Sequence, residues 1–89
     1  MAKKSILRLT LKRKYFAEIV AREKHFEYRE RKPYWKTRLE GRHYDQILFR
    51  NGYSKSAPEM LVEFCGLQRT RSSYVIRLGR IRSLKRWRG

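Results

Sequence analysis

The sequence predicts an α+β fold: a small five-stranded β-barrel with one helix inserted after the first strand and a second, short helix after the second strand. Five short segments alternate polar and apolar residues as strands do, and one segment has the spacing of a helix. Closing the sheet would remove edges that the small core of an 89-residue chain protects poorly. We predict a single domain over residues 1–89, with a basic tail over about 82–89.

The first half of the chain predicts strand, helix, strand. Residues 6–11 place leucines at every second position, which is typical of a strand with one buried face. Residues 12–22 carry apolar side chains at helical spacing, and residues 25–31 return to alternation. In that second strand one face carries His25, Glu27, Arg29 and Arg31.

The second half predicts a short helix and three more strands. Pro33 suits the first position of a helix and Gly41 suits its end. In this helix we expect Trp35 to be buried and Tyr34 to be exposed. The remaining strands are predicted at residues 44–50, 60–67 and 73–78, with a polar loop over 53–58 and a basic hairpin over 68–72.

Few residues of the chain favour a metal or a disulfide. Cys65 is the only cysteine, so it forms no disulfide within the chain, and its apolar strand predicts a small buried side chain. One cysteine and two histidines without matching spacing predict no zinc site, and no cofactor is expected. Trp87 has two interpretations: stacking on a nucleic-acid base or packing against the barrel.

The charge of the chain indicates an anionic partner. With 24 Lys and Arg against 8 Asp and Glu the net charge is +16, and self-repulsion of that size opposes a compact fold. From Phe64 onward there are eight basic residues and no acidic one. No apolar run approaches the ~18 residues of a spanning helix. We therefore expect a soluble cytoplasmic protein, monomeric by preference, that binds RNA, with DNA as a second candidate.

The segment from Arg22 to Arg29 carries the most specific pattern. It places Lys24, Glu27 and Arg29 where the first helix is followed by the second strand. A carboxylate between basic side chains on one strand face is one way for a small domain to build a recognition pocket. An ordinary solvated pair of charges on the same strand face is the alternative interpretation.

This octapeptide and the order of elements resemble the ASCH family, a branch of the PUA-like β-barrels. The family signature looks like Gly-x-Lys-x-x-Glu-x-Arg, in which Lys24, Glu27 and Arg29 fill the charged places and Arg22 stands where glycine is usual. The resemblance covers about residues 6–81. It implies a cleft between the first helix and the barrel, lined by the signature and suited to single-stranded RNA or a nucleoside base.

We expect Lys24 and Arg29 to keep Glu27 ionised and oriented, so that its carboxylate reads a base. The surrounding Lys and Arg side chains suit the phosphates of a nucleic acid, and the aromatic side chains suit stacking on its bases. The candidate RNA-binding residues are Lys12, Lys24, Glu27, Arg29, Arg31, Tyr34, Arg50, Arg69 and Arg71.

Two other classes of function stay open. Some relatives look like amidohydrolases on acylated cytidine, but these resemble an arrangement with Thr where this chain has Glu27. Others look like ribonucleases, for which Lys24, His25 and Tyr28 would supply the acid and the base. A protein-interaction adaptor is the third class of function considered, and the high charge argues against it as the main role.

Overall fold

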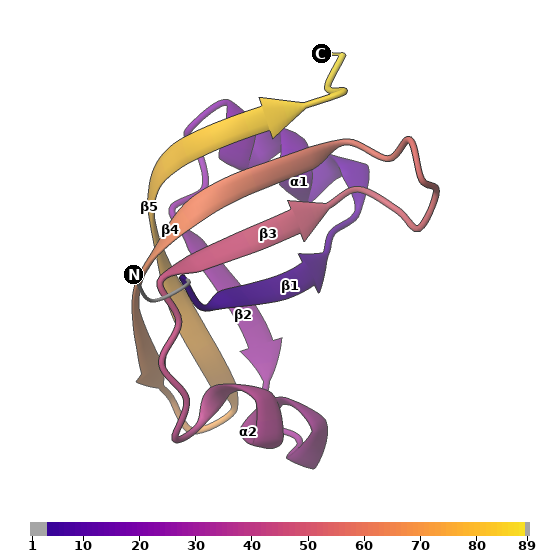
Figure 1. Cartoon of the computed structure of the whole chain (residues 1–89). Coiled ribbons are helices and arrows are strands. Elements are labelled where there is room, and N and C mark those ends of the chain that lie inside the picture. The colour runs from indigo at the N-terminus through magenta and orange to yellow at the C-terminus, as the bar shows by residue number, and fades with distance from the viewer. Residues whose placement is uncertain (1–3, 89) are drawn as a thin grey trace.

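The computed structural model describes residues 4–88 as a five-stranded sheet with two helices (Figure 1). The order of strands in the sheet is β1-β3-β4-β5-β2. Only the pair of β1 and β3 is parallel. Along the chain the elements are β1 Ile6–Thr10, α1 Arg13–Val20, β2 Phe26–Glu30, α2 Pro33–Leu39, β3 Gln46–Arg50, β4 Glu59–Arg69 and β5 Ser73–Lys85.

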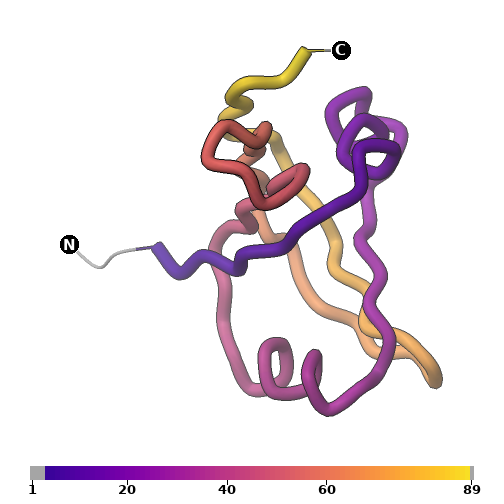
Figure 2. The backbone as a smooth tube through the Cα atoms, turned by 90° about the vertical axis from the view of Figure 1, so that its right-hand side faces the viewer, coloured from indigo at the N-terminus to yellow at the C-terminus, as the bar shows by residue number. Residues whose placement is uncertain are grey.

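The sheet curls into a half-barrel, which confirms the α+β class, the five strands and the positions of both helices. Three register shifts interrupt the pairing of β4 with β5. Such shifts arise where one strand has an extra unpaired residue, and they bend the strand. The chain passes from α1 through β2 to α2, so the two helices lie at opposite ends of β2 (Figure 2).

The core fills the inner face of the curled sheet. Apolar side chains from β1, β3, β4 and β5 meet there with Phe16 and Ile19 of α1 and Leu39 of α2. Burying each large side chain of this kind contributes about 1.5–3 kcal/mol. Tyr34 is exposed, as predicted, whereas Trp35 is only half-buried and packs against the edge of this core.

The first part of the predicted basic tail, residues 82–85, belongs to strand β5. Strand β5 continues to Lys85, seven residues past its predicted end, because residues 81–85 pair with β4 across the register shifts. Trp87 lies 5.0 Å from Phe16 between ring centroids, and the carbonyl of Arg88 accepts a hydrogen bond from Arg13. The segment after β5 therefore packs back onto α1, which was the second interpretation of Trp87.

The predicted burial of Cys65 is also wrong, since its side chain is exposed. Val62 and Phe64 face the core, so the alternation of the strand turns Cys65 outward beside the bulge at Gly66. The apolar character of the segment concealed which of its two faces Cys65 occupies.

Helix α1 ends in a Schellman motif that orients the chain toward β2. The N–H of Glu23 donates to the carbonyl of Glu18 at 2.9 Å, and the N–H of Arg22 donates to Ile19 at 3.0 Å. Arg22 adopts φ 61°, the left-handed conformation that glycine reaches most easily. The N–H of Lys24 then donates to the same carbonyl of Glu18 at 3.1 Å, which places Lys24 at the entrance to β2.

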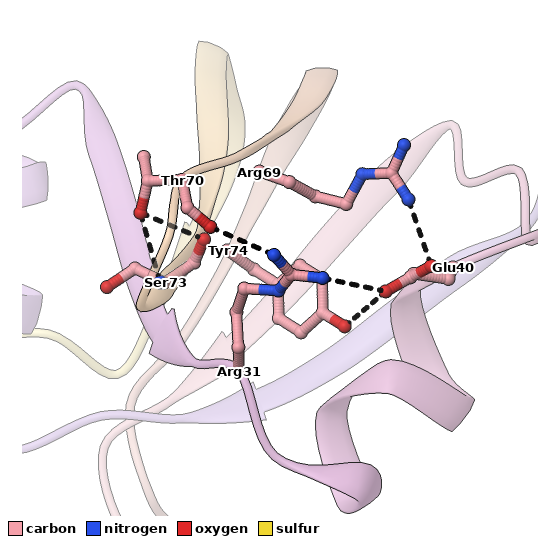
Figure 3. A network of polar contacts seen from close by, with 6 residues as sticks. All are labelled: Arg31, Glu40, Arg69, Thr70, Ser73 and Tyr74. Carbon is pink, nitrogen blue, oxygen red and sulfur yellow. Dashed lines mark hydrogen bonds and ion pairs between the residues drawn. The ribbon is translucent and has the colours of Figure 1, made fainter.

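A polar cluster holds the end of α2 against the turn between β4 and β5 (Figure 3). Glu40 accepts hydrogen bonds from the Tyr74 hydroxyl at 2.5 Å and from Arg69 at 3.0 Å, and it lies 4.0 Å from Arg31. The bond from Tyr74 is the main cause that lowers the pKa of Glu40 below its usual value. Arg31 also donates to the carbonyl of Thr70, so the cluster joins three elements.

Among residues 4–88, no helix combines the length and the apolar character needed to cross a bilayer.

Replacing Arg22 with glycine should stabilise the protein. A residue with a Cβ in this conformation costs about 1–2 kcal/mol, and the added chain entropy of glycine offsets about 0.5–1 kcal/mol of that. We expect Arg22→Gly to raise the free energy of unfolding by about 0.5–1 kcal/mol in urea denaturation. Glu23→Gly is the matched control and should lower it, because φ is not positive there. A less stable Arg22→Gly would contradict the assigned conformation.

Candidate nucleic-acid interface

Glu27 is a carboxylate on the core-facing side of β2. It pairs in register with Ile76 of β5, whose side chain is fully buried, and Glu27 itself is only 3% exposed. The alternation predicted for residues 25–31 is therefore confirmed. At Glu27 the charged face of β2 points into the fold, while His25 and Arg31 at the two ends of this face are exposed.

Two cations neutralise this buried carboxylate. Arg29 Nη1 lies 2.5 Å from one oxygen of Glu27, and Lys24 Nζ lies 3.5 Å from the other. Burial nevertheless raises the pKa of Glu27 above its usual value, and the charges of Arg29 and Lys24 oppose that shift. The three signature residues thus converge on one point below the surface.

Neither β1 nor β2 pairs with a strand on its second side. Leu11 N donates to the carbonyl of Arg50, so the odd-numbered residues of β1 bond β3, and the backbone groups of Arg8 and Thr10 face the free edge. We call the gap between the free edges of β1 and β2 the seam.

On the β2 side the same reasoning applies. The carbonyl of His25 accepts from Leu78 N, and Arg31 N donates to Ser72, so the odd-numbered residues of β2 bond β5. The carbonyl of Tyr28 therefore faces the seam, and the pairing pattern leaves it without a strand partner.

Arg29 spans the seam. Its guanidinium donates long hydrogen bonds of 3.4 Å to the carbonyl of Thr10 on β1 and of 3.4 Å to that of Tyr28 on β2. It also lies 5.1 Å from the centroid of the Trp35 ring, a cation–π distance. One side chain thus links two strand edges that form no ladder, and Glu27 holds that side chain in place.

A cleft of about 470 Å³ opens along the seam. Its volume falls within the range of ~300–1,000 Å³ common for ligand sites. Its walls combine a strand edge, two arginines and three aromatic residues. The residues that line this seam cleft are Arg8, Leu9, Thr10, Arg29, Tyr34, Trp35 and Tyr53.

A second hollow of about 370 Å³ lies between the end of α1 and β2, and we call it the helix depression. The ammonium of Lys24 lies there, 5.0 Å from the Tyr28 ring centroid and 5.7 Å from that of Tyr15. The residues that line it are Glu18, Glu23, Lys24, His25, Phe26 and Tyr28. The two cations around Glu27 therefore line two different hollows: Lys24 lines the helix depression and Arg29 lines the seam cleft.

Most of the other predicted site residues lie elsewhere. Arg31 and Arg69 share Glu40, and Arg50 lies 3.0 Å from Glu59, so each of the three has a carboxylate partner within the fold. Lys12 precedes α1 and Arg71 lies in the turn between β4 and β5, and both are exposed. Of the nine predicted RNA-binding residues, the structure gathers Lys24, Glu27, Arg29 and Tyr34.

Sequence reasoning missed the contribution of β1 and of the loop after β3. Alternation places Arg8 and Thr10 on the face opposite the leucines of β1, but it does not show that this strand is an edge. Tyr53 is 88% exposed in a polar loop, and its place in the wall of the cleft follows only from the folded chain.

The ion pairs divide the cations into two groups. Within residues 4–88, eight Lys and Arg side chains pair with five carboxylates. Most of the other cations in that range have no carboxylate partner. These unmatched cations carry the excess charge and are available to an anionic ligand. No cluster of His, Cys, Asp and Glu suited to a metal ion occurs in the same range.

Removing Arg29 should destabilise the protein most at neutral pH. Arg29→Met leaves Glu27 buried and short of its nearest cation, which should cost about 2–4 kcal/mol, at the lower end for buried pairs because the Arg29 side chain is 20% exposed. The raised pKa of Glu27 would rise further, so the folded state would bind a proton more tightly than the unfolded state. The loss of stability relative to wild type should therefore shrink as pH falls from about 7 to about 5.

Urea denaturation at both pH values measures this difference. Arg80→Met is the matched control, since Arg80 is exposed and its side chain forms no ion pair within residues 4–88, and its effect should be small at both values. A loss of stability in Arg29→Met that does not depend on pH would contradict the role given to Glu27.

Comparison of the chain with family models, with curated proteins and with solved structures found no match. The convergence of Lys24, Glu27 and Arg29 is thus an observation on this chain alone, and the ASCH resemblance stays a prediction that rests on the octapeptide and the order of elements.

Proposed function

We propose that this half-barrel is a PUA-like domain that binds single-stranded RNA, with one base in the seam cleft. The observation that carries the proposal is Arg29, held by buried Glu27 between two free strand edges and beside aromatic rings. The excess of unmatched cations supports an anionic polymer as the ligand.

The walls of the seam cleft suit a base. Tyr34 and Tyr53 offer exposed rings, and each base stacked on an aromatic side chain contributes about 1–3 kcal/mol. The backbone groups at the free edge of β1 can hydrogen-bond the edge of a base, since splayed bases expose those atoms. Single-stranded RNA fits this chemistry better than a duplex, whose bases are stacked and covered.

Glu27 takes a different role from the one predicted from the sequence. At 3% exposed, its carboxylate is covered by Arg29 and Lys24, so direct reading of an exocyclic amine would require it to move. We assign Glu27 as a positioning residue, because it fixes the two cations that reach the two hollows. Selectivity among bases then comes from the seam cleft.

A ribonuclease is the second candidate, favoured by one observation. Lys24, His25 and Tyr28, which were predicted as possible acid and base groups, all line the helix depression. A mass or gel analysis of RNA incubated with the protein should show cleavage that is abolished in Lys24→Ala if this candidate holds. RNA that stays intact after long incubation would contradict the ribonuclease candidate and would be consistent with binding alone.

The binding proposal predicts strong dependence on salt and on Tyr34. If about four phosphates are neutralised, affinity should fall about tenfold or more between low and physiological salt. Tyr34→Ala should weaken binding by about fivefold or more, equivalent to about 1 kcal/mol for the removal of one stacked ring. Fluorescence anisotropy with a short labelled RNA oligomer measures both effects.

Tyr28→Ala is the matched control for Tyr34→Ala. The two rings are similarly exposed, at 54% and 58%, but Tyr28 lines the helix depression and Tyr34 the seam cleft. Circular dichroism should show both variants folded. Equal losses of affinity in the two variants would argue against a base in the seam cleft, and salt-independent binding would argue against RNA altogether.

A further inference from the structure

Tyr34 forms a wall of two hollows. Its side chain lines both the seam cleft and a groove of about 380 Å³ over α2. The residues that line this α2 groove are Tyr34, Thr37, Arg38, Arg42 and Tyr44. A ligand that leaves the seam cleft past Tyr34 therefore enters a groove with two guanidinium groups.

Both arginines of the α2 groove are held in place by interactions within the fold. The guanidinium of Arg38 lies 4.3 Å from the centroid of the Tyr34 ring, and Arg42 Nε donates to the carbonyl of Thr37 at 2.9 Å. Tyr44 donates its hydroxyl proton to the carbonyl of Arg38 at 2.6 Å, which ties the end of α2 to the segment before β3. Such interactions reduce the entropy penalty when the side chains bind a ligand.

No carboxylate matches these two charges. Neither Arg38 nor Arg42 forms an ion pair within residues 4–88, and none of the five lining residues is acidic. The contrast is with Arg31 and Arg69, also close to the end of α2, which share Glu40. Two fixed guanidinium groups without a counter-charge form a site for a phosphate, which arginine binds through paired N–H donors.

We propose that the α2 groove binds the phosphodiester of the nucleotide next to the base in the seam cleft. Tyr34 would separate the two subsites, with its ring available to a base on one side and its partner Arg38 directed to the phosphate on the other. The ligand is then a single strand of at least two nucleotides that runs from the seam across α2. This inference rests on the proposed function, since it takes the seam cleft as the first subsite.

If both subsites exist, the protein should differ in its affinity for short and long ligands. A single nucleoside monophosphate occupies the seam cleft without reaching across α2, whereas an oligomer of about six nucleotides engages both subsites, and linked binding raises affinity. The wild-type protein should therefore bind the oligomer more tightly than the monophosphate. Arg38→Gln combined with Arg42→Gln should remove most of that difference in affinity.

The experiment compares this double variant with a control of equal charge. Arg77→Gln with Arg80→Gln removes two exposed arginines from β5, away from the α2 groove. By fluorescence anisotropy, the Arg38 and Arg42 variant should bind the oligomer about tenfold more weakly, with a salt slope shallower by about 0.7 for each phosphate that is no longer neutralised. Its affinity for the monophosphate should stay within about twofold, and the control should lose much less affinity for the oligomer.

The outcomes separate the two proposals. If the wild-type protein binds neither ligand, the proposed function fails and this inference fails with it. If both double variants lose the same affinity for the oligomer, binding is spread over the surface. The proposal of a phosphate site in the α2 groove then fails, while the proposal of RNA binding stands. A polyglutamate peptide that binds in place of RNA, and that the Arg38 and Arg42 variant releases, would assign the groove to an acidic protein instead.

Discussion

The structure depends on how an open barrel is held together where its two edge strands fail to pair. The ion pair of Glu27 and Arg29 bridges this seam. The guanidinium links the free edges of β1 and β2, and the carboxylate holds the guanidinium in place. Burying a carboxylate is unfavourable, and apolar residues of similar volume are often as stabilising as a buried pair. Apolar side chains would fill the same space, but they could not offer hydrogen-bond donors to two unpaired backbone carbonyls. The pair is therefore better explained by the geometry of the seam than by stability alone.

The same seam explains why the proposed ligand site lies at this place. Free strand edges expose donors and acceptors that favour pairing with another chain, and small proteins usually cover or charge them. Here the β1 edge lines a cleft together with Tyr34, Trp35 and Tyr53, so the walls of this cleft limit access to its polar groups. A planar ligand with its own donors and acceptors can enter such a cleft, whereas a full additional strand would have to displace Arg29. The feature that protects the edge also restricts what binds to it.

The sequence predicted the elements well because five strands and two helices follow local patterns. The inward direction of Glu27 was open from the sequence, since alternation shows that Glu27 shares a face with Arg29 but not whether that face is buried. The end of β5 was missed because register shifts with β4 disturb the period of two. Cys65 was predicted to be buried from the apolar character of its segment, although alternation with Val62 and Phe64 turns it outward. The seam itself depends on which strands are edges, a property of the whole sheet. No segment of the chain carries that information by itself.

In so basic a chain, the positions of the few carboxylates are more informative than those of the many cations. Lys and Arg are spread over every part of the sequence, so a cluster of them is expected by chance and identifies no site. A carboxylate beside an arginine offsets part of its charge and makes it part of the fold, as Glu40 does for Arg31 and Arg69 and as Glu59 does for Arg50. This is why three residues that looked like phosphate ligands in the sequence have structural partners in the folded chain. The cations that are fixed by aromatic rings or backbone carbonyls, without a carboxylate, combine defined geometry with unneutralised charge. The proposed phosphate site uses such cations because they would lose the least side-chain entropy on binding.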